Sequence, residues 1–199
     1  YSIINPKRTD NAFTFNALAG VGVAFMLILN LYEKLKTKEE AYVYLDLVAI
    51  GTIADIVPLV KENRIFAKHG LEKLLYSENK GLRFLITKLF ETAKLEFTTY
   101  DVGFVIAPVF NAAGRLKDAK MVVKLLTSDN DREIEVISKE LINKNFERRE
   151  LQTTLVELVE ANIQKNNLND NLVIVDASSE YHHGIIGIIA SKVVDAHYK

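Results

Sequence analysis

The sequence predicts an α/β protein in which helices predominate and a long helix leads into the beginning of a second α/β domain. Three observations support this fold class. Apolar residues recur at helical spacing through much of the first 127 residues, and no Gly or Pro interrupts the stretch from Asp129 to Gln164. The short apolar segment Leu172–Val175 has the length and composition of a buried strand.

The first half of the chain reads as a strand followed by a series of helices. Residues 1–6 predict a strand that ends in a turn, and the apolar run Ala17–Leu29 predicts a buried helix. Further helical segments are expected at 45–60, at 63–75, along the stripe Leu82, Leu85, Ile86 and Leu89, and from a cap at Thr99 or Asp101 to an end at Pro108.

The second half is dominated by the long helix. A helix of about 35 residues would span about 50 Å, which is longer than a compact domain requires and suggests a connection between two bodies. The Asn-rich segment Asn166–Asn171 marks a boundary, and a helix is expected from Gly184 to Val194. We therefore expect three parts, at 1–127, 128–166 and 167–199, with the last one truncated. Because there is no initiating Met, we also expect the chain to be a piece of a longer protein.

The composition limits the possible functions. The 199 residues are 49% hydrophobic and 26% charged with a formal net charge of -1, so nucleic-acid binding would have to depend on local clusters. The absence of cysteine excludes disulfides, thiolate metal sites and a cysteine nucleophile, and favours a cytoplasmic location. The run Ala17–Leu29 is shorter than the roughly 20 residues of a membrane-spanning helix, so no membrane segment is expected.

Asp55 is the first candidate for chemistry. It lies in the apolar stretch Gly51–Pro58, where a buried carboxylate would need a hydrogen-bond partner, an ion-pair partner or a metal ion. A helix or turn cap is the alternative explanation for Asp55. For Asp46, which directly precedes an apolar helical run, capping is the expected role.

Two further segments could bind an anion. Asn111 and Arg115 flank small residues, and a guanidinium can hold phosphate through two parallel hydrogen bonds. Lys117, Lys120 and Lys124 follow, although such lysines, like Arg115 itself, can equally be solvated. In the segment Tyr181–Ser191, His182 and Gly184 lie between a predicted strand and a predicted helix N-terminus, where anions are favoured.

Histidine gives little support for a zinc site. The neighbouring side chains of His182 and His183 would diverge, and the sequence has no second His-rich partner segment. His69 and His197 have no constellation of candidate ligands around them.

Taken together and in this order, these segments resemble the RecJ family of DHH phosphoesterases, which are single-stranded-DNA-specific 5′ to 3′ exonucleases. The matching residues are Asn5–Arg8, Phe15, Leu18–Phe25, Leu45–Asp55, Asn63, Arg64, Pro108, Asn111–Arg115, Asn145, Arg148 and His182 with Gly184–Ser191. The resemblance covers nearly the whole chain.

The resemblance implies roles for several of the matching residues. Asp55 would be a catalytic ligand of Mn²⁺ or Mg²⁺ in a two-metal site, which suits the hard oxygen chemistry of these ions. Asn111 and Arg115 would hold a phosphate, while His182 and Gly184 would contact the DNA strand from a DHH-associated domain. The remaining matches, Asp46, Asn63, Arg64, Asn145 and Arg148, would have structural or interdomain roles.

The resemblance also defines the expected parts and partners. Residues 1–127 would be the C-terminal part of the DHH domain, 128–166 the interdomain connector helix, and 167–199 the start of the DHH-associated domain. The substrate would be single-stranded DNA in repair and recombination, and a single-strand-binding protein or a helicase would be a possible partner.

Two departures from the family pattern stand out. Val109 occupies a position where family members usually have Arg, and the Asp-x-Asp and Asp-His-His motifs that supply most metal ligands would precede Tyr1. We therefore expect these 199 residues alone to be inactive. Three alternatives stay open: a DHH phosphodiesterase of short oligonucleotides or cyclic dinucleotides, a non-catalytic RecJ-like DNA-binding scaffold, and a helical α/β domain with no nucleic-acid role.

Overall fold

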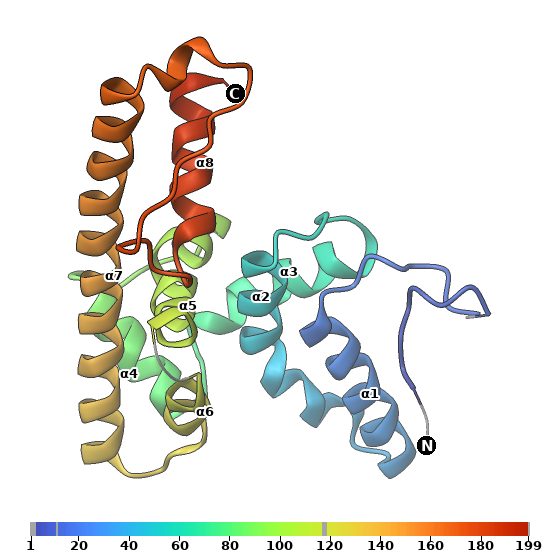
Figure 1. Cartoon of the computed structure of the whole chain (residues 1–199). Coiled ribbons are helices and arrows are strands. Elements are labelled where there is room, and N and C mark those ends of the chain that lie inside the picture. Colours follow the sequence, from blue (N-terminus) through green and yellow to red (C-terminus); the bar gives the residue numbers. More distant parts are fainter. Residues whose placement is uncertain (1–2, 11, 117–118, 199) are drawn as a thin grey trace. The chain divides into compact units, whose positions relative to one another are not determined.

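The computed structural model describes residues 3–10, 12–116 and 119–198, and within them every regular element is a helix (Figure 1). The α-helices are α1 Gly20–Leu35, α2 Leu45–Ala54, α3 Lys61–Leu74, α4 Lys80–Leu89, α5 Ala107–Leu116, α6 Lys120–Thr127, α7 Asp131–Lys165 and α8 Ile186–His197. Two 3₁₀ segments, η1 Lys38–Tyr44 and η3 Leu168–Asp170, and one π-helical segment, η2 Asp101–Ile106, complete the set. The expected predominance of helix is confirmed.

The chain forms two compact units. Unit 1 contains residues 1–108 and 123–138, and unit 2 contains residues 109–122 and 139–199. Helix α7 begins in unit 1 and continues in unit 2, so these boundaries differ from the expected parts at 1–127, 128–166 and 167–199. Among the described residues, no helix combines the length and the apolar character needed to cross a membrane.

The core of unit 1 is built where α1, α2 and α3 meet. Phe25 of α1 contacts Phe66 of α3 edge to face, with ring centroids 5.3 Å apart, in a cluster that also contains Val48 of α2. Helices α2 and α3 approach closely at Gly70, where an added methyl group would lie 2.2 Å from the Leu45 carbonyl oxygen. This close packing fixes the orientation of α2 against α3 and therefore the position of the C-terminal end of α2.

The core of unit 2 is a seam between α7 and α8 (Figure 1). Leu155, Val159 and Ile163 recur every four residues along α7 and form one apolar stripe. Ile189 and Val193 of α8, with their neighbour Ile185, pack on that stripe. The expected long helix at 129–164 is thus confirmed as α7, and its second half is held by α8.

Pro108 does not end a helix as the sequence predicted. It is the second residue of α5, and the π-helical segment η2 runs directly into α5. The Ala107 N–H donates to the Val102 carbonyl five residues earlier, so the turn before Pro108 is wider than an α-helical one. A wide turn accommodates the proline ring and its missing N–H, which explains why the helix continues.

The cap of that helix also differs from the prediction. Thr98, rather than Thr99 or Asp101, accepts a hydrogen bond from the Asp101 N–H at 3.3 Å, and Asp101 accepts in return from the Thr98 N–H at 2.8 Å. This reciprocal pair is a capping box. Thr98 is therefore the N-cap residue, and Asp101 is the third residue of the helix.

The predicted strands are wrong for the described residues. Residues 3–5 and 172–175 contain no strand, and Leu172, Val173 and Val175 are 96%, 68% and 76% exposed. A strand is stable only when a neighbouring strand takes up its backbone hydrogen bonds, and the described residues offer none. The α/β label is therefore not confirmed.

Candidate functional site

Asp55 lies at the point where α2 ends. It is the C-cap residue of α2, and its N–H still donates to the Gly51 carbonyl at 3.0 Å. The next residue, Ile56, has φ of 54° and is 89% exposed. A β-branched residue in the left-handed region is strained by about 1–3 kcal/mol, and such strain is typical of functional sites. The sharp turn leaves the Asp55 side chain exposed.

A cavity of about 420 Å³ opens beside Asp55. It is lined by Lys7, Asn16, Ala17, Leu18, Asp55, Val57 and Pro58. Among the described residues, neither the Asp55 carboxylate nor the Lys7 ammonium has an ion-pair or hydrogen-bond partner. A carboxylate, an amide and an ammonium group therefore face one cavity, which suits a divalent cation near Asp55 and an anion near Lys7.

Asn63 connects the two walls of this cavity. It is fully buried at the start of α3, and its Nδ2 donates to the Ala17 carbonyl at 2.7 Å and to the Pro58 carbonyl at 3.0 Å. Both acceptors belong to residues that line the cavity. Asn63 thus fixes the loop after Asp55 against the segment before α1, while its neighbour Arg64 is exposed.

Asp46 is in the first turn of α2 and is 1% exposed. Its carboxylate accepts hydrogen bonds from the Leu47 N–H at 2.7 Å and from the Ser77 hydroxyl at 2.6 Å. Burial raises the pKa of the Asp46 carboxyl, and the Ser77 hydrogen bond opposes this effect. The N-cap position of α2 is Tyr44 and has no side-chain capping bond, so Asp46 is not the N-cap residue; its carboxylate accepts from the Leu47 N–H within the first turn and does not line the Asp55 cavity.

In unit 2 the structure brings Arg115, His182 and Gly184 together. Arg115 Nη1 donates to the Gly184 carbonyl at 2.8 Å, and the Gly184 N–H donates to His182 Nδ1 at 3.1 Å. A methyl group on Gly184 would lie 2.2 Å from the Arg115 carbonyl oxygen, so only glycine permits this approach. Asn111 is exposed four residues before Arg115 on α5, and residues at that spacing share a helix face.

Of the lysines after Arg115, Lys124 is paired with Glu133 at 2.6 Å. Lys117 lies outside the described residues, and Lys120 is the first residue of α6. Lys124 thus has a carboxylate partner of its own, while Arg115 is the residue that contacts Gly184.

Asn145 and Arg148 are adjacent on one face of α7. Arg148 donates through Nε and Nη2 to Asn145 Oδ1, at 3.3 and 3.1 Å, and through Nη1 to Gln152 Oε1 at 3.2 Å. Burial lowers the pKa of the Arg148 guanidinium, and the positive charges of Arg149 and Arg115 lower it further. Arg148 is thus a half-buried cation close to Arg115.

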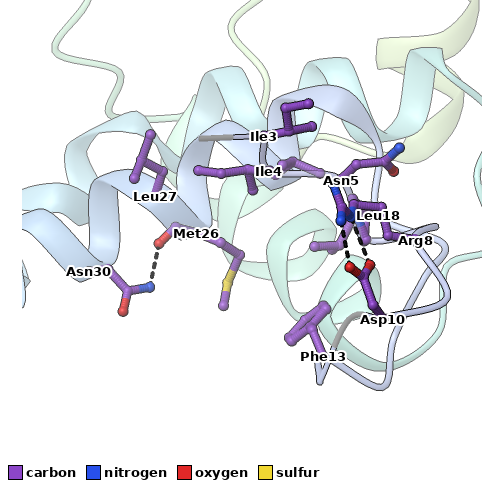
Figure 2. A pocket seen from close by; sticks show the side chains of 12 residues that line it. Ile3, Ile4, Asn5, Arg8, Asp10, Phe13, Leu18, Met26, Leu27 and Asn30 are labelled. Atoms are coloured by element: carbon purple, nitrogen blue, oxygen red, sulfur yellow. Dashed lines mark hydrogen bonds and ion pairs between the residues drawn. The ribbon is translucent and has the colours of Figure 1, made fainter. Parts of the chain in front are cut away.

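The remaining histidines and a second cavity fall outside these clusters. His69 lies 3.4 Å from Glu72 on the surface of α3, and His197 is 2.9 Å from Glu160 in unit 2. Figure 2 shows the second cavity, of about 530 Å³, whose walls are mainly aliphatic and whose Arg8 is paired with Asp10. An apolar wall does not suit a metal ion or a phosphate.

Sequence reasoning gave no role to Lys7 or Asn16. Lys7 falls within a matching stretch, but only the folded chain places it and Asn16 in the cavity of Asp55. Among the described residues, no group of three or more His, Asp or Glu side chains could hold a metal ion. Asp55 is therefore a single carboxylate whose oxygen chemistry would suit Mn²⁺ or Mg²⁺, and a metal site would need further ligands from other residues.

Comparison with known proteins identifies relatives along the whole chain. The single-stranded-DNA-specific exonuclease RecJ of Bacillus subtilis is 38% identical over 198 residues, which cover 100% of this chain and 24% of that protein. RecJ of Escherichia coli is 34% identical over 212 residues, covering 100% of this chain and 37% of the relative. No family model matches the chain.

Solved structures give the same relationship. Manganese-bound RecJ from Thermus thermophilus superposes with a TM-score of 0.79 at 33% identity and covers 94% of this chain and 28% of its own. A second manganese-bound exonuclease RecJ gives a TM-score of 0.81 at 33% identity over 96% of this chain and 47% of its own. The chain thus spans between about a quarter and two fifths of these curated relatives. Over its whole length, it is a homologue of a part of RecJ, the single-stranded-DNA-specific exonuclease.

Proposed function

We propose that the protein containing this chain is a metal-dependent exonuclease that hydrolyses single-stranded DNA from the 5′ end, in DNA repair and recombination. The observation that carries this proposal is the exposed carboxylate of Asp55, which has no partner in the described part of the chain and lines a cavity together with Lys7 and Asn16. The similarity to RecJ along the whole chain supports the same activity.

Asp55 would hold Mn²⁺ or Mg²⁺ together with ligands outside these 199 residues. When bound, two such ions would supply activation of water and neutralisation of charge on the phosphodiester. Asn63 would keep the Asp55 loop in place through its hydrogen bonds to Ala17 and Pro58. Lys7 would attract the negatively charged strand to the same cavity.

Unit 2 would supply the phosphate contacts. Arg115 and Asn111 would bind a backbone phosphate, and His182 and Gly184 would contact the strand beside Arg115. In this proposal residues 1–127 are the end of a DHH catalytic domain, 128–166 are the connector helix and 167–199 begin the DHH-associated domain. The protein would act in the cytoplasm, and a single-strand-binding protein or a helicase would be a natural partner.

The proposal is tested by digestion of a 5′-labelled single strand by the whole protein in the presence of Mn²⁺. Asp55→Ala should abolish hydrolysis with little loss of DNA binding, whereas Arg115→Ala should weaken both. The isolated 199 residues should be inactive. Unchanged hydrolysis by Asp55→Ala would remove Asp55 from the metal site.

Two alternatives make different predictions in the same assay. A phosphodiesterase of short substrates would cleave dinucleotides faster than long single strands. A non-catalytic scaffold would bind single-stranded DNA without cleaving it in any metal. The long helix α7 favours the exonuclease, because the family resemblance implies a shorter connection between domains in the phosphodiesterases of short substrates.

A further inference from the structure

Arg148 is a half-buried cation whose partners, within the described ranges, are neutral. All three of its hydrogen bonds go to the amide oxygens of Asn145 and Gln152. Among the described residues, no carboxylate lies within ion-pair distance of Arg148, although α7 carries many acidic side chains. A guanidinium that has lost part of its water shell without gaining an anion is electrostatically costly.

A second cation increases this cost. Arg115 also donates to a neutral group, the Gly184 carbonyl, and no carboxylate pairs with it among the described residues. The charges of Arg115 and Arg149 act on Arg148 strongly enough to depress its pKa, although burial is the larger cause. Positive charge is therefore concentrated at this place in unit 2, and no side-chain anion among the described residues pairs with Arg115 or Arg148.

The hydrogen bonds of Arg148 leave part of the guanidinium available. An arginine side chain has five N–H donors, and the bonds to Asn145 and Gln152 use one donor on each nitrogen. The second N–H of Nη1 and of Nη2 remain. Because Asn145 and Gln152 hold the group from two turns of α7, its orientation is fixed before a ligand arrives.

We propose that Arg148 is a phosphate-binding residue that acts together with Arg115 on the backbone of single-stranded DNA. Asn145 and Gln152 would be positioning residues for its guanidinium. A phosphate would take the two remaining N–H donors and balance the charge of both arginines. That the phosphate belongs to single-stranded DNA rests on the proposed function. Inorganic phosphate offers the same chemistry, and the experiment distinguishes the two.

The test is the salt dependence of DNA binding by the whole protein, with EDTA present so that no strand is cleaved. Fluorescence anisotropy of a labelled oligothymidylate would be measured from low to high KCl for wild type, Arg148→Gln and Arg149→Gln. Arg149 is the matched control, because it is exposed and adjacent and its loss removes the same formal charge. Arg148→Gln should weaken binding by about tenfold and reduce the slope of log K against log salt by about 0.7, the value for one phosphate contact on a single strand.

Arg149→Gln should leave that slope nearly unchanged. Arg148→Lys, which keeps the charge but not the planar fork, should retain most of the slope and lose part of the affinity. Thermal unfolding of each variant shows whether unit 2 still folds. If Arg148→Gln unfolds at the same temperature as wild type, its weaker DNA binding cannot be assigned to unfolding.

Three results would overturn the inference. Equal slopes for Arg148→Gln and wild type, or equal losses for the Arg148 and Arg149 variants, would show that Arg148 makes no phosphate contact. A thermal shift by millimolar inorganic phosphate that depends on Arg148, without any effect on DNA binding, would assign the site to free phosphate. Failure of wild type to bind single strands would overturn the proposed function and this inference with it.

Discussion

Replacement of Asn63 should loosen the wall of the Asp55 cavity. In Asn63→Leu, a side chain of similar size loses both hydrogen bonds, to the Ala17 carbonyl at 2.7 Å and to the Pro58 carbonyl at 3.0 Å. Each such bond contributes about 1 kcal/mol, and the exposed Pro58 carbonyl keeps a second donor, the Val60 N–H at 2.9 Å. The free energy of unfolding of unit 1 should therefore fall by about 2 kcal/mol.

Thr52→Val is the matched control for Asn63→Leu. Thr52 is also fully buried in unit 1, but its hydroxyl has no hydrogen-bond partner among the described residues. Deletion of a polar atom that makes no bond should leave stability unchanged or raise it. Urea unfolding followed by circular dichroism gives the two free energies, and amide hydrogen exchange shows whether the loss is in the loop 55–60. Equal stability of the two variants would mean that Asn63 does not hold the loop.

The remaining predictions concern Asp46 and Gly184. Because burial raises the pKa of Asp46, the folded state binds the Asp46 proton more tightly than the unfolded state does. The contribution of protonated Asp46 to stability is therefore complete below about pH 4, the unfolded pKa, and is lost as pH rises through the raised pKa of the folded state. Asp46→Asn should therefore gain stability relative to wild type as pH rises above about 4, and a pH-independent difference in urea unfolding would contradict this. Gly184→Ala places a methyl group 2.2 Å from the Arg115 carbonyl oxygen and should destabilise unit 2 by about 1–3 kcal/mol. Gly187→Ala, whose added methyl meets nothing within 4 Å, should be neutral or stabilising in the same thermal unfolding experiment.

The helices that carry long apolar stripes were predictable from the sequence. Helix α7 lies within two residues of the expected range because its stretch contains no helix breaker and repeats its apolar residues every three or four positions. Pro108 was misjudged because the sequence does not reveal the π-helical turn that accommodates it. The segment 172–175 has strand-like composition, but composition cannot supply the pairing partner that a strand requires.

The candidate sites were predictable only in part. The apolar surroundings of Asp55 drew attention to its carboxylate, but the cavity it shares with Lys7 depends on contacts between segments almost fifty residues apart. The approach of Arg115 to Gly184 joins residues separated by 69 positions, which no local pattern specifies. The unexpected feature is Arg148, whose neutral partners are visible only in the folded chain.

The assignment of Asp55 as a metal ligand is tested most directly by Mn²⁺ binding, measured from the electron paramagnetic resonance signal of the free ion. The whole protein would be titrated as wild type, Asp55→Asn and Asp10→Asn, the last being an exposed carboxylate that pairs with Arg8 in unit 1. Asp55→Asn should weaken Mn²⁺ binding by on the order of tenfold or more, while Asp10→Asn should bind as wild type does. Identical titration curves for wild type and Asp55→Asn would show that Asp55 does not hold the metal.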